Sequence, residues 1–391
     1  MQNKVVIVSA VRTPLGCFMG SLSEVSAVDL GITALKGALS KIDLDKNLID
    51  ELIVGHVLQS GCGQAPAKQI AMGLNLKHNI PCSTINKVCS SGMKAVSLAA
   101  QSIQLGLNDI VIAGGIESMS NAPHYINLRK SNKYGHKTFS DGLMIDGLTD
   151  AYSSNSMGVL ADNCSFKYKI SRERQDEYTV FSYNRSIESN KNGFFKNEIV
   201  PVVYNDKKGN KVLIEVDEQI SKVNFDKISK LNPVFVKNGT ITAANSSPIS
   251  DGASILILMN KKKAIDLNIK PIAEIVGYTD SATQPDLFTI APSNAIEKLI
   301  KITNTDINQV DLFEINEAFS MVPLVNIDIL NLDPKKVNIN GGAVSLGHPL
   351  GCSGARIIST LIHSLHFSNK KIGIAAICNG GGGASSIQIK I

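Results

Sequence analysis

The chain of 391 residues contains no tryptophan, and only 5% of its residues are aromatic. Proteins that hold single-stranded nucleic acid stack its bases on aromatic side chains, so this composition does not support such a surface. The net charge of +5 is too small to indicate a nucleic-acid partner, although it would help an anionic small molecule to approach. A hydrophobic content of 43% is ordinary for a globular protein, and the length suggests about two to three domains.

Regularly spaced cysteines and metal ligands are missing as well. The seven cysteines are scattered and none forms a C-x-x-C pair, which argues against a disulfide framework and favours a reducing compartment. His363 and His366 are the only close histidine pair, and no carboxylate or thiolate stands near them in the sequence. A metal site built on this pair is therefore not expected.

Long apolar runs are absent too. The strand-like run at 253–259 is far shorter than the roughly 20 apolar residues of a membrane-spanning helix. No secretory or arginine-rich leader precedes the first strand-like segment, at 4–10. We therefore expect no membrane partner, and a location in the cytoplasm, or in the mitochondrial matrix if a transit peptide has been removed.

What the chain does contain is a faint internal repeat. Residues 91–113 match 353–375, and 49–54 match 310–315 at an offset one lower. A strand and a helix precede each copy, at 4–10 and 29–40 and again at 272–278 and 293–302. Chance could produce so weak a match, but its order over a whole β-α-β-α-β-like unit favours duplication. The alternation predicts a mixed or mostly parallel sheet covered on both faces.

The segment between the copies differs in composition. Residues 118–250 carry 18 Lys and Arg against 14 Asp and Glu, so +4 of the net +5 lies there. We predict an N-terminal half formed by 1–117 and 251–270, an inserted loop domain at 118–250, and a C-terminal half at 271–391. The strand-like run at 253–259 is expected to return to the first half as its edge strand.

Cys89 is the first candidate for chemistry. It follows a strand-like segment, 82–88, and directly precedes a helical one, 91–105. A helix N-terminus stabilises a thiolate, so the pKa of Cys89 is expected to fall from about 8.5 towards neutrality and make this thiol a nucleophile. A buried structural cysteine is an equally weighted alternative.

His348 and Cys378 stand in glycine-rich segments of the second copy. His348 lies between Gly347 and Pro349, where it could take a proton from a thiol, although a loop histidine bonded to a carbonyl is the simpler interpretation. Cys378 heads four glycines that lead into a strand and lack the Lys-Ser/Thr of a phosphate loop. We therefore favour backbone N–H groups aimed at an oxyanion.

The reactive residues are not themselves repeated. Cys89 aligns with Gly351, and Cys378 aligns with Ile116. Asn316, after the strand-like segment 310–315, means little alone. We predict a single site at which the first half supplies the nucleophile and the second half supplies the acid and base groups.

At these motifs the chain resembles the thiolase family, from about residue 4 to residue 391. Four signature segments occur in order, at 86–94, 316–319, 341–349 and 378–383, with further matches at 8–14 and 114–120. Residues 230–231 and 242–245 point to the mitochondrial-type acetyl-CoA acetyltransferases (acetoacetyl-CoA thiolases). The resemblance implies an α/β fold in which duplicated βαβαβ units form a layered αβαβα core, with an inserted loop domain.

The resemblance also implies a mechanism. Cys89 would be acylated by an acyl-CoA with the help of His348, and Cys378 would remove the α-proton of acetyl-CoA. His348 and a water held by Asn316 would stabilise the enolate, and the N–H groups of Cys89 and Gly380 would stabilise the acyl oxyanion. The implied reaction is the reversible Claisen condensation of two acetyl-CoA to acetoacetyl-CoA and CoA, with ping-pong kinetics and no prosthetic group.

Substrate and ion sites are implied by position in the family. Coenzyme A contacts are expected at Tyr183, Lys222, Val223, Asn224, Lys227, Ser247, Leu148, Met157, Phe235, Ala318 and Phe319. A potassium ion is expected at Tyr183, Ala243, Ala244, Ser246 and Val344. A homotetramer is the expected assembly. For Lys222 and Lys227, a solvated charged face is the alternative interpretation. Ser156 and Pro248 depart from the family pattern, so the resemblance does not carry one pantetheine contact or the conformation of one loop over to this chain.

Other activities fit parts of the sequence. A longer-chain 3-ketoacyl-CoA thiolase would carry the same motifs. An inactive acyl-CoA or lipid carrier on the same fold is disfavoured, because Cys89, Asn316, His348 and Cys378 are all present. A β-ketoacyl synthase would have a second histidine in place of Cys378.

Overall fold

The computed structural model describes residues 3–129 and 134–391. Within them, ten strands form one sheet in the order β12-β13-β14-β11-β1-β10-β5-β3-β4, with β2 beside β10. The strands are β1 Val5–Arg12, β2 Gly16–Cys17, β3 Glu51–Gly55, β4 Cys82–Ile85, β5 Ile110–Ser118, β10 Ser250–Asn260, β11 Ala273–Ala282, β12 Leu312–Ile315, β13 Ile372–Asn379 and β14 Gly383–Lys390. The helices around them are α1 Ala27–Ser40, α2 Pro66–Gly73, α3 Ser91–Gln104, α7 Lys261–Asp266, α8 Ala291–Thr303, α9 Met321–Leu330, α10 Ala343–Leu346 and α11 Leu350–Phe367.

Two half-sheets meet at a short antiparallel contact, where Val6 and Ile7 of β1 face Glu274 and Ala273 of β11. The strand order is mirrored about this contact, so that β11, β14, β13 and β12 correspond to β1, β10, β5 and β3. The second half has no counterpart of β4 among its described strands, and a single parallel bridge from Phe313 to Val337 takes that place. Among the paired strands that the structure describes, β3–β4, β3–β5 and β12–β13 are parallel and the other pairs are antiparallel. The prediction of a mixed sheet is confirmed.

The position expected for the strand-like run at 253–259 is wrong. This run forms most of β10, which pairs with β1 on one side and with β5 on the other, so it is a central strand. All but one of its residues are buried, which suits a strand covered on both faces better than an edge. The edge is β4, whose residues are partly exposed.

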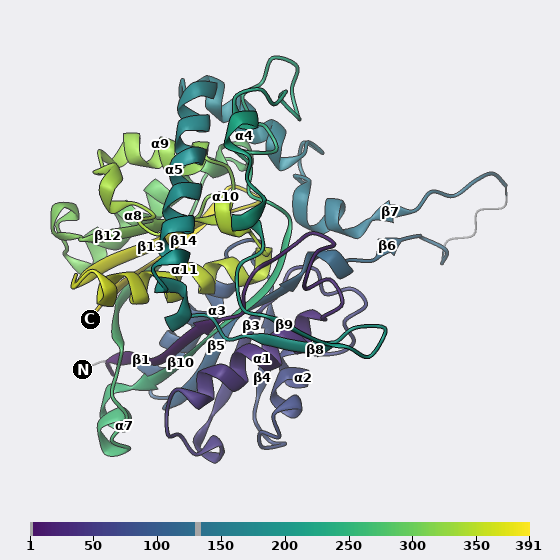
Figure 1. The fold of residues 1–391 in the computed structure, drawn as a ribbon. Coiled ribbons are helices and arrows are strands. Elements are labelled where there is room, and N and C mark those ends of the chain that lie inside the picture. The colour runs from purple at the N-terminus through teal and green to yellow at the C-terminus, as the bar shows by residue number, and fades with distance from the viewer. Residues whose placement is uncertain (1–2, 130–133) are drawn as a thin grey trace.

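Five layers follow from where the apolar side chains gather. Helices α3 and α11 lie between the two half-sheets and share one core cluster with β1, β5, β10, β11, β13 and β14. Helices α1 and α2 cover the outer face of the first half, and α8 and α9 cover that of the second (Figure 1). Helix α11 is buried almost all round, as expected for a helix between two sheets. The predicted αβαβα arrangement is confirmed.

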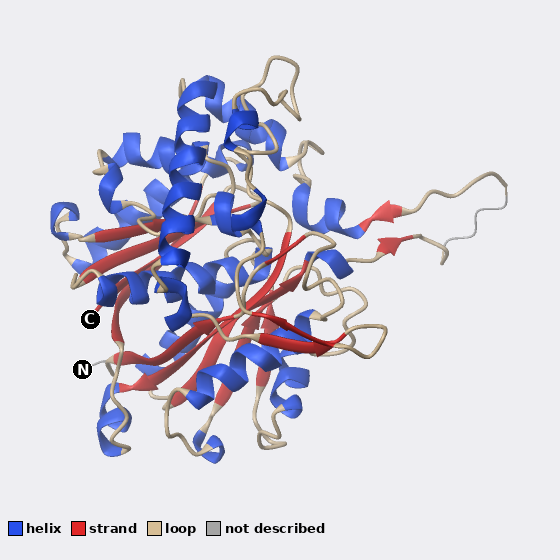
Figure 2. Cartoon of the chain, viewed as in Figure 1, coloured by secondary structure: helices blue, strands red, loops and turns tan. Residues whose placement is uncertain are grey.

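The residues between the two copies add helices and small hairpins on more than one side of the molecule, and one of these hairpins projects to the right of the view (Figure 1 and Figure 2). They contain β6 His124–Tyr125, β7 Ser140–Asp141, α4 Met157–Lys167, α5 Arg172–Lys191, β8 Val202–Asn205, β9 Lys211–Ile214 and α6 Phe225–Ile228. Leu160 and Tyr178 join the core beneath α8 and α9, which ties this segment to the second half. In the described residues, no helix combines the length and the apolar character needed to cross a membrane.

Candidate active site

A strained turn presents Cys89. Strand β4 ends at Ile85 and α3 begins at Ser91, and between them Val88 has a φ of 49°. A β-branched residue rarely adopts this left-handed conformation, so its surroundings must hold it there. The Val88 N–H donates to Asn86 Oδ1 at 2.8 Å, and Ser91 Oγ donates to the Val88 carbonyl at 2.6 Å. The turn thereby places Cys89 immediately before the helix.

Two glycines let the first half meet the second at this point. A Cβ atom on Gly92 would press on the Gly351 carbonyl and the Ala355 N–H, and one on Gly354 would press on the backbone of Met93. The N-terminal ends of α3 and α11 therefore touch through backbone. Their close approach brings Cys89 next to the loop that carries His348.

Four of the five predicted catalytic residues line one cavity of about 390 Å³, and Asn316 is not among its lining residues. Cys89 reaches it from the first half, and His348, Cys378 and Gly380 reach it from the second. The wall is otherwise formed by Met144, Gly147, Leu148, Ser156, Met157, Gly158, Val234, Phe235, Ala243, Ser246, Ser247, Ile249, Phe288, Ala318, Phe319 and Leu350. The lining is mostly apolar, with a few polar atoms at the centre, as is typical of a small-molecule site.

His348 is held as a neutral base. Its Nδ1 lies 2.6 Å from Ser353 Oγ, which itself donates to the Pro349 carbonyl at 2.8 Å. Ser353 must therefore accept from His348, which puts the proton on Nδ1 and leaves Nε2 as the acceptor of the ring, facing Asn316 Nδ2 at 3.4 Å. Burial, and then the positive charge of Arg356, lower the pKa of His348 to about 3.

The pKa expected for Cys89 from the sequence is wrong, because its thiol is neutral at rest. Burial raises the pKa of Cys89 to about 12, although the N–H groups of Gly380 and of Cys89 itself oppose this. Burial and the neighbouring Cys89 also raise the pKa of Cys378. The helix N-terminus is too small an effect to offset desolvation here. The free protein therefore holds neutral thiols beside a neutral imidazole.

Donors for two oxyanions surround these groups. The N–H groups of Cys89 and Gly380 lie near enough to the Cys89 sulfur to lower the pKa of its thiol, against the effect of burial. Asn316 Nδ2 lies 3.4 Å from His348 Nε2, and Asn316 Oδ1 is buried with no hydrogen-bond partner among the described residues. Such an orphaned amide oxygen is suited to holding a water.

The glycines at 380–383 differ in how much room surrounds them. A Cβ on Gly380 would make only ordinary contacts, with Val88 and Met157. Gly382 has a φ of +79°, and a side chain there would collide with the backbone at Thr283 and Gln284. A side chain on Gly383 would also collide with the Asn379 side chain, and Gly381 has a φ of +82°. The demand for glycine therefore falls on 381–383 rather than on Gly380.

Comparisons with known proteins agree with this geometry. Residues 5–262 match the family model of the thiolase N-terminal domain, and residues 269–391 match that of the thiolase C-terminal domain. The chain belongs to the thiolase family. It is 51% identical over 396 residues to the acetyl-CoA acetyltransferase of Saccharomyces cerevisiae, with 100% of each chain covered. It is 48% identical over 389 residues to the mitochondrial acetyl-CoA acetyltransferase of Bos taurus, covering 99% of this chain and 92% of the relative. The crystal structure of the Acat5 thiolase from Ascaris suum in complex with coenzyme A has a TM-score of 0.94, 44% identity and 99% coverage of both chains.

The thiolase site also contains a buried carboxylate whose role the sequence did not reveal. Glu117 accepts from the N–H groups of Val57 at 3.2 Å, Leu58 at 3.1 Å and Gly351 at 2.8 Å. It thereby ties the first half to the first turn of α11, which directly follows the loop that carries His348. Glu117 lies in a family motif at 114–120, which is the only signal in the sequence that could have drawn attention to it.

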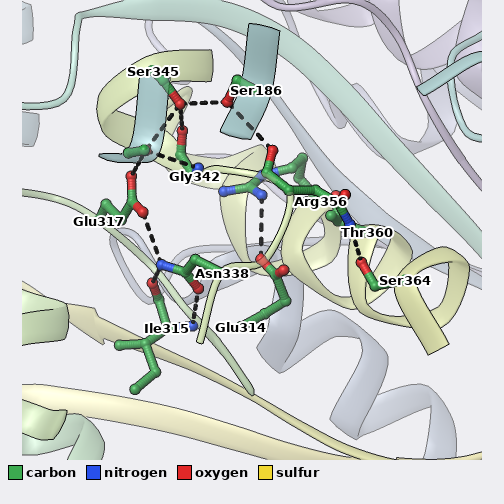
Figure 3. A network of polar contacts seen from close by, with 12 residues as sticks. Ser186, Glu314, Ile315, Glu317, Asn338, Gly342, Ser345, Arg356, Thr360 and Ser364 are labelled. Carbon is green, nitrogen blue, oxygen red and sulfur yellow. Dashed lines mark hydrogen bonds and ion pairs between the residues drawn. The ribbon is translucent and has the colours of Figure 1, made fainter. Parts of the chain in front are cut away.

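A second carboxylate, Glu317, fixes the segment ahead of His348 (Figure 3). It accepts from Tyr178 Oη at 2.9 Å, Ser182 Oγ at 2.8 Å and the Val344 N–H at 3.0 Å. Tyr178 and Ser182 come from α5, so the inserted segment helps to hold this part of the thiolase site. Glu317 directly follows Asn316, and its four donors, the fourth being Asn338 Nδ2 at 2.9 Å, keep that backbone in place.

The residues expected to contact coenzyme A divide into two groups. Leu148, Met157, Phe235, Ser247, Ala318 and Phe319 line the cavity. Tyr183, Lys222, Val223, Asn224 and Lys227 do not. The ammonium of Lys222 lies 2.5 Å from Glu218 Oε1, so an anion would compete with that carboxylate for it. Of the positions expected to hold potassium, Ala243 and Ser246 line the cavity.

Proposed function

We propose that this thiolase is an acetyl-CoA C-acetyltransferase that catalyses the reversible Claisen condensation of two acetyl-CoA to acetoacetyl-CoA and CoA. One observation carries the proposal: Cys89, His348, Cys378 and Gly380 converge from two halves of the chain on one cavity of about 390 Å³. No step requires a prosthetic group, because the thioester itself activates both carbons.

In the first half-reaction, Cys89 becomes acetylated. The Nε2 atom of His348 accepts the thiol proton as the sulfur attacks the acetyl-CoA carbonyl, because neither group is ionised beforehand. The N–H groups of Cys89 and Gly380 stabilise the tetrahedral oxyanion. When the C–S bond to coenzyme A breaks, His348 returns its proton to the departing thiolate.

In the second half-reaction, the acetyl group leaves Cys89. The Cys378 thiol gives its proton to His348 Nε2, and the resulting Cys378 thiolate accepts the α-proton of a second acetyl-CoA. The protonated His348, with Asn316, stabilises the enolate oxygen. The carbanion attacks the acetyl-cysteine carbonyl, the C–S bond breaks, and the Cys89 thiolate is released with acetoacetyl-CoA. His348 then returns its proton to the Cys89 sulfur, which restores the neutral groups of the free enzyme for ping-pong turnover.

Short acyl groups are the proposed substrates. The large side chains of Phe288, Phe319 and Met157 all form part of the wall of this cavity. The relatives at about 50% identity are acetyl-CoA acetyltransferases by name. A thiolase for longer 3-ketoacyl chains would need this wall to open, and no observation favours that alternative.

A chain-length series tests the proposal. Purified protein is given free CoA and 3-ketoacyl-CoA substrates from C4 to C16, and thiolysis is followed by loss of the 3-ketoacyl-CoA absorbance. We expect kcat/KM to be highest for acetoacetyl-CoA and to fall with each added carbon pair. A maximum at C8 or longer would replace the proposal with the longer-chain activity, and no thiolysis from folded protein would remove both.

Further features of the proposal concern ions, assembly and location. The donor set at Tyr183, Ala243, Ala244, Ser246 and Val344 contains neutral oxygens only, which suits potassium better than a divalent or thiophilic metal. We propose that potassium bound there would steady the loop at the cavity wall. We also propose a homotetramer that acts on acyl-CoA in the cytoplasm or mitochondrial matrix, since relatives named as cytosolic and as mitochondrial both exist.

A further inference from the structure

A cluster of charges spans the boundary between the two halves behind the nucleophile. Asp280, in β11 of the second half, accepts from Lys87 Nζ at 2.5 Å and from Lys94 Nζ at 2.7 Å. Ser385 Oγ donates to the same carboxylate at 2.6 Å. Lys87 Nζ also donates to Ser385 Oγ at 2.8 Å and to the Ala384 carbonyl at 3.3 Å. The contacts thus tie two lysines of the first half to two strands of the second.

The residues of this cluster lie close in sequence to the turns that carry Cys89 and Gly380. Lys87 directly precedes the strained Val88, and Cys89 follows. Ala384 and Ser385 are the second and third residues of β14, just after the turn that carries Gly380. The cluster therefore anchors two pieces of backbone, one from each half, that carry the N–H groups of Cys89 and Gly380 near the Cys89 sulfur.

The electrostatics keep the cluster ionised at neutral pH. Burial would raise the pKa of Asp280, but hydrogen bonds from Lys87, Lys94 and Ser385 outweigh it and bring the pKa to about 2. Burial lowers the pKa of Lys87, against the attraction of Asp280. The side chains of Lys87, Lys94 and Asp280 are between a quarter and two-fifths exposed, so solvent only partly screens their charges.

We propose that Asp280 is a positioning residue that sets the spacing between the Cys89 and Gly380 N–H groups, an inference that rests on the proposed acyl-transfer function. No single element carries both donors, so their spacing depends on contacts across the boundary. Without the carboxylate, the two lysines would repel each other and the strained turn at Val88 would lose its anchor to β14. Oxyanion stabilisation depends steeply on donor placement, so a small displacement should slow the chemistry while leaving the coenzyme A cavity intact.

The same strand offers a matched control. Glu274, also in β11, joins two lysines in the same manner, with Lys261 Nζ at 2.9 Å and Lys4 Nζ at 3.6 Å. It lies at the far end of β11 from Asp280, and it does not line the cavity. Asp280→Asn and Glu274→Gln therefore remove the same kind of charge from the same strand at different distances from the sulfur.

The experiment compares these two variants in acetoacetyl-CoA thiolysis. We expect Asp280→Asn to lower kcat by about 10- to 30-fold with KM changed less than twofold, a smaller loss than the 10²–10³-fold that follows removal of a whole oxyanion donor. Asp280→Glu should recover part of that loss, and Glu274→Gln should match the parent. Equal kcat in Asp280→Asn and Glu274→Gln would overturn the proposal, as would a loss in Asp280→Asn that appears only in KM.

A second readout is independent of turnover. Alkylation of Cys89 by iodoacetamide, followed by mass spectrometry of its peptide, should be severalfold slower in Asp280→Asn than in Glu274→Gln, because Gly380 would no longer support the thiolate. If the parent protein has no thiolase activity, this difference still supports the positioning role while the proposed function fails; equal alkylation rates overturn the role. If Asp280→Asn does not fold, Ser385→Ala replaces it in the comparison, because it removes one contact of the cluster. We expect Ser385→Ala to lower kcat two- to fivefold, and an unchanged kcat would overturn the proposal.

Discussion

The two halves of the chain share residues that fix their strands and helices, but they do not share the reactive residues. Asp50 accepts from the N–H groups of Asp109 and Ile110 at 2.8 and 2.9 Å, and Asp311 accepts from those of Lys371 and Ile372, both at 3.0 Å. Each aspartate fixes the start of the strand beside it. Gly92 and Gly354 likewise occupy matching places where α3 and α11 meet. These pairs support the interpretation that the halves arose by duplication.

The reactive groups differ between the same two halves. The first half places Cys89 at a turn before α3, where the second half has Gly351 in α11. The second half places Cys378 near the end of β13, where the first has Ile116 in β5. Both halves face one cavity, so each role is needed once. Capping and close-packing residues are needed in both copies, which explains why they are the ones that still match.

Removing the nucleophile should have the largest effect. Cys89→Ala leaves the second half intact but gives the acyl group no attachment, so kcat for thiolysis should fall by on the order of 10⁴-fold or more. The measurement is a coupled thiolysis assay with circular dichroism to verify folding. Activity within 100-fold of the parent would mean that the first half does not supply the nucleophile.

Cys378→Ala should separate the two half-reactions. It removes the proposed base in the second half, so condensation should fall by about 10³-fold, within the range of a general base. Acetyl transfer to Cys89, measured by exchange of labelled CoA into acetyl-CoA, should remain within a few-fold of the parent. Loss of exchange together with condensation would contradict the division of labour between the halves.

The reactivity of Cys89 should rise steadily with pH. Because burial raises the pKa of this thiol to about 12, the thiolate is a small fraction at pH 7. Its alkylation by iodoacetamide should therefore accelerate about tenfold for each pH unit between 7 and 9. A plateau above pH 7 would show that the helix N-terminus controls the thiol after all.

Ser353→Ala tests a pair of matching serines, Ser91 and Ser353, that have different roles in the two halves. Ser91 Oγ donates to the Val88 carbonyl and steadies the nucleophile turn, whereas its counterpart Ser353 holds the tautomer of His348. We expect a loss in kcat on the order of 10-fold, well below the 10²–10⁴-fold of a complete general base. Ser353→Thr should restore much of the activity, and an unchanged pH–rate profile in Ser353→Ala would argue against tautomer control.

The sequence could predict the layered fold and the residues that meet in the cavity, because local alternation and long motifs carry that information. It could not predict the pKa of Cys89, since burial depends on the whole assembled cavity. It also gave no role to Glu117 or Asp280, whose partners Gly351 and Lys87 lie 234 and 193 residues away. The central place of β10 was missed because an apolar run fits an edge or a buried strand equally well by pattern alone.

The smallest effect concerns a buried acid that only the second half contains. Glu314 stands where the first half has Ile53, and its nearest cation is Arg356 at 3.8 Å, a guanidinium with no hydrogen bond among the described residues (Figure 3). Burial raises the pKa of Glu314 from 4.5 to about 8, even though Arg356 opposes the shift.

The folded protein should therefore keep a proton on Glu314 that the unfolded chain releases above a pH of about 4.5. The free energy of unfolding should fall as the pH rises from there to about 8, by at most about 1.4 kcal/mol per pH unit from this group. Glu314→Gln removes this slope, so it should match the parent near pH 5 and be more stable at pH 8.5. Urea unfolding at both pH values measures it, with the exposed Glu297→Gln as control. Equal stability of Glu314→Gln and the parent at pH 8.5 would mean that Arg356 keeps Glu314 ionised, and that the second half holds a true ion pair where the first half holds only apolar contacts.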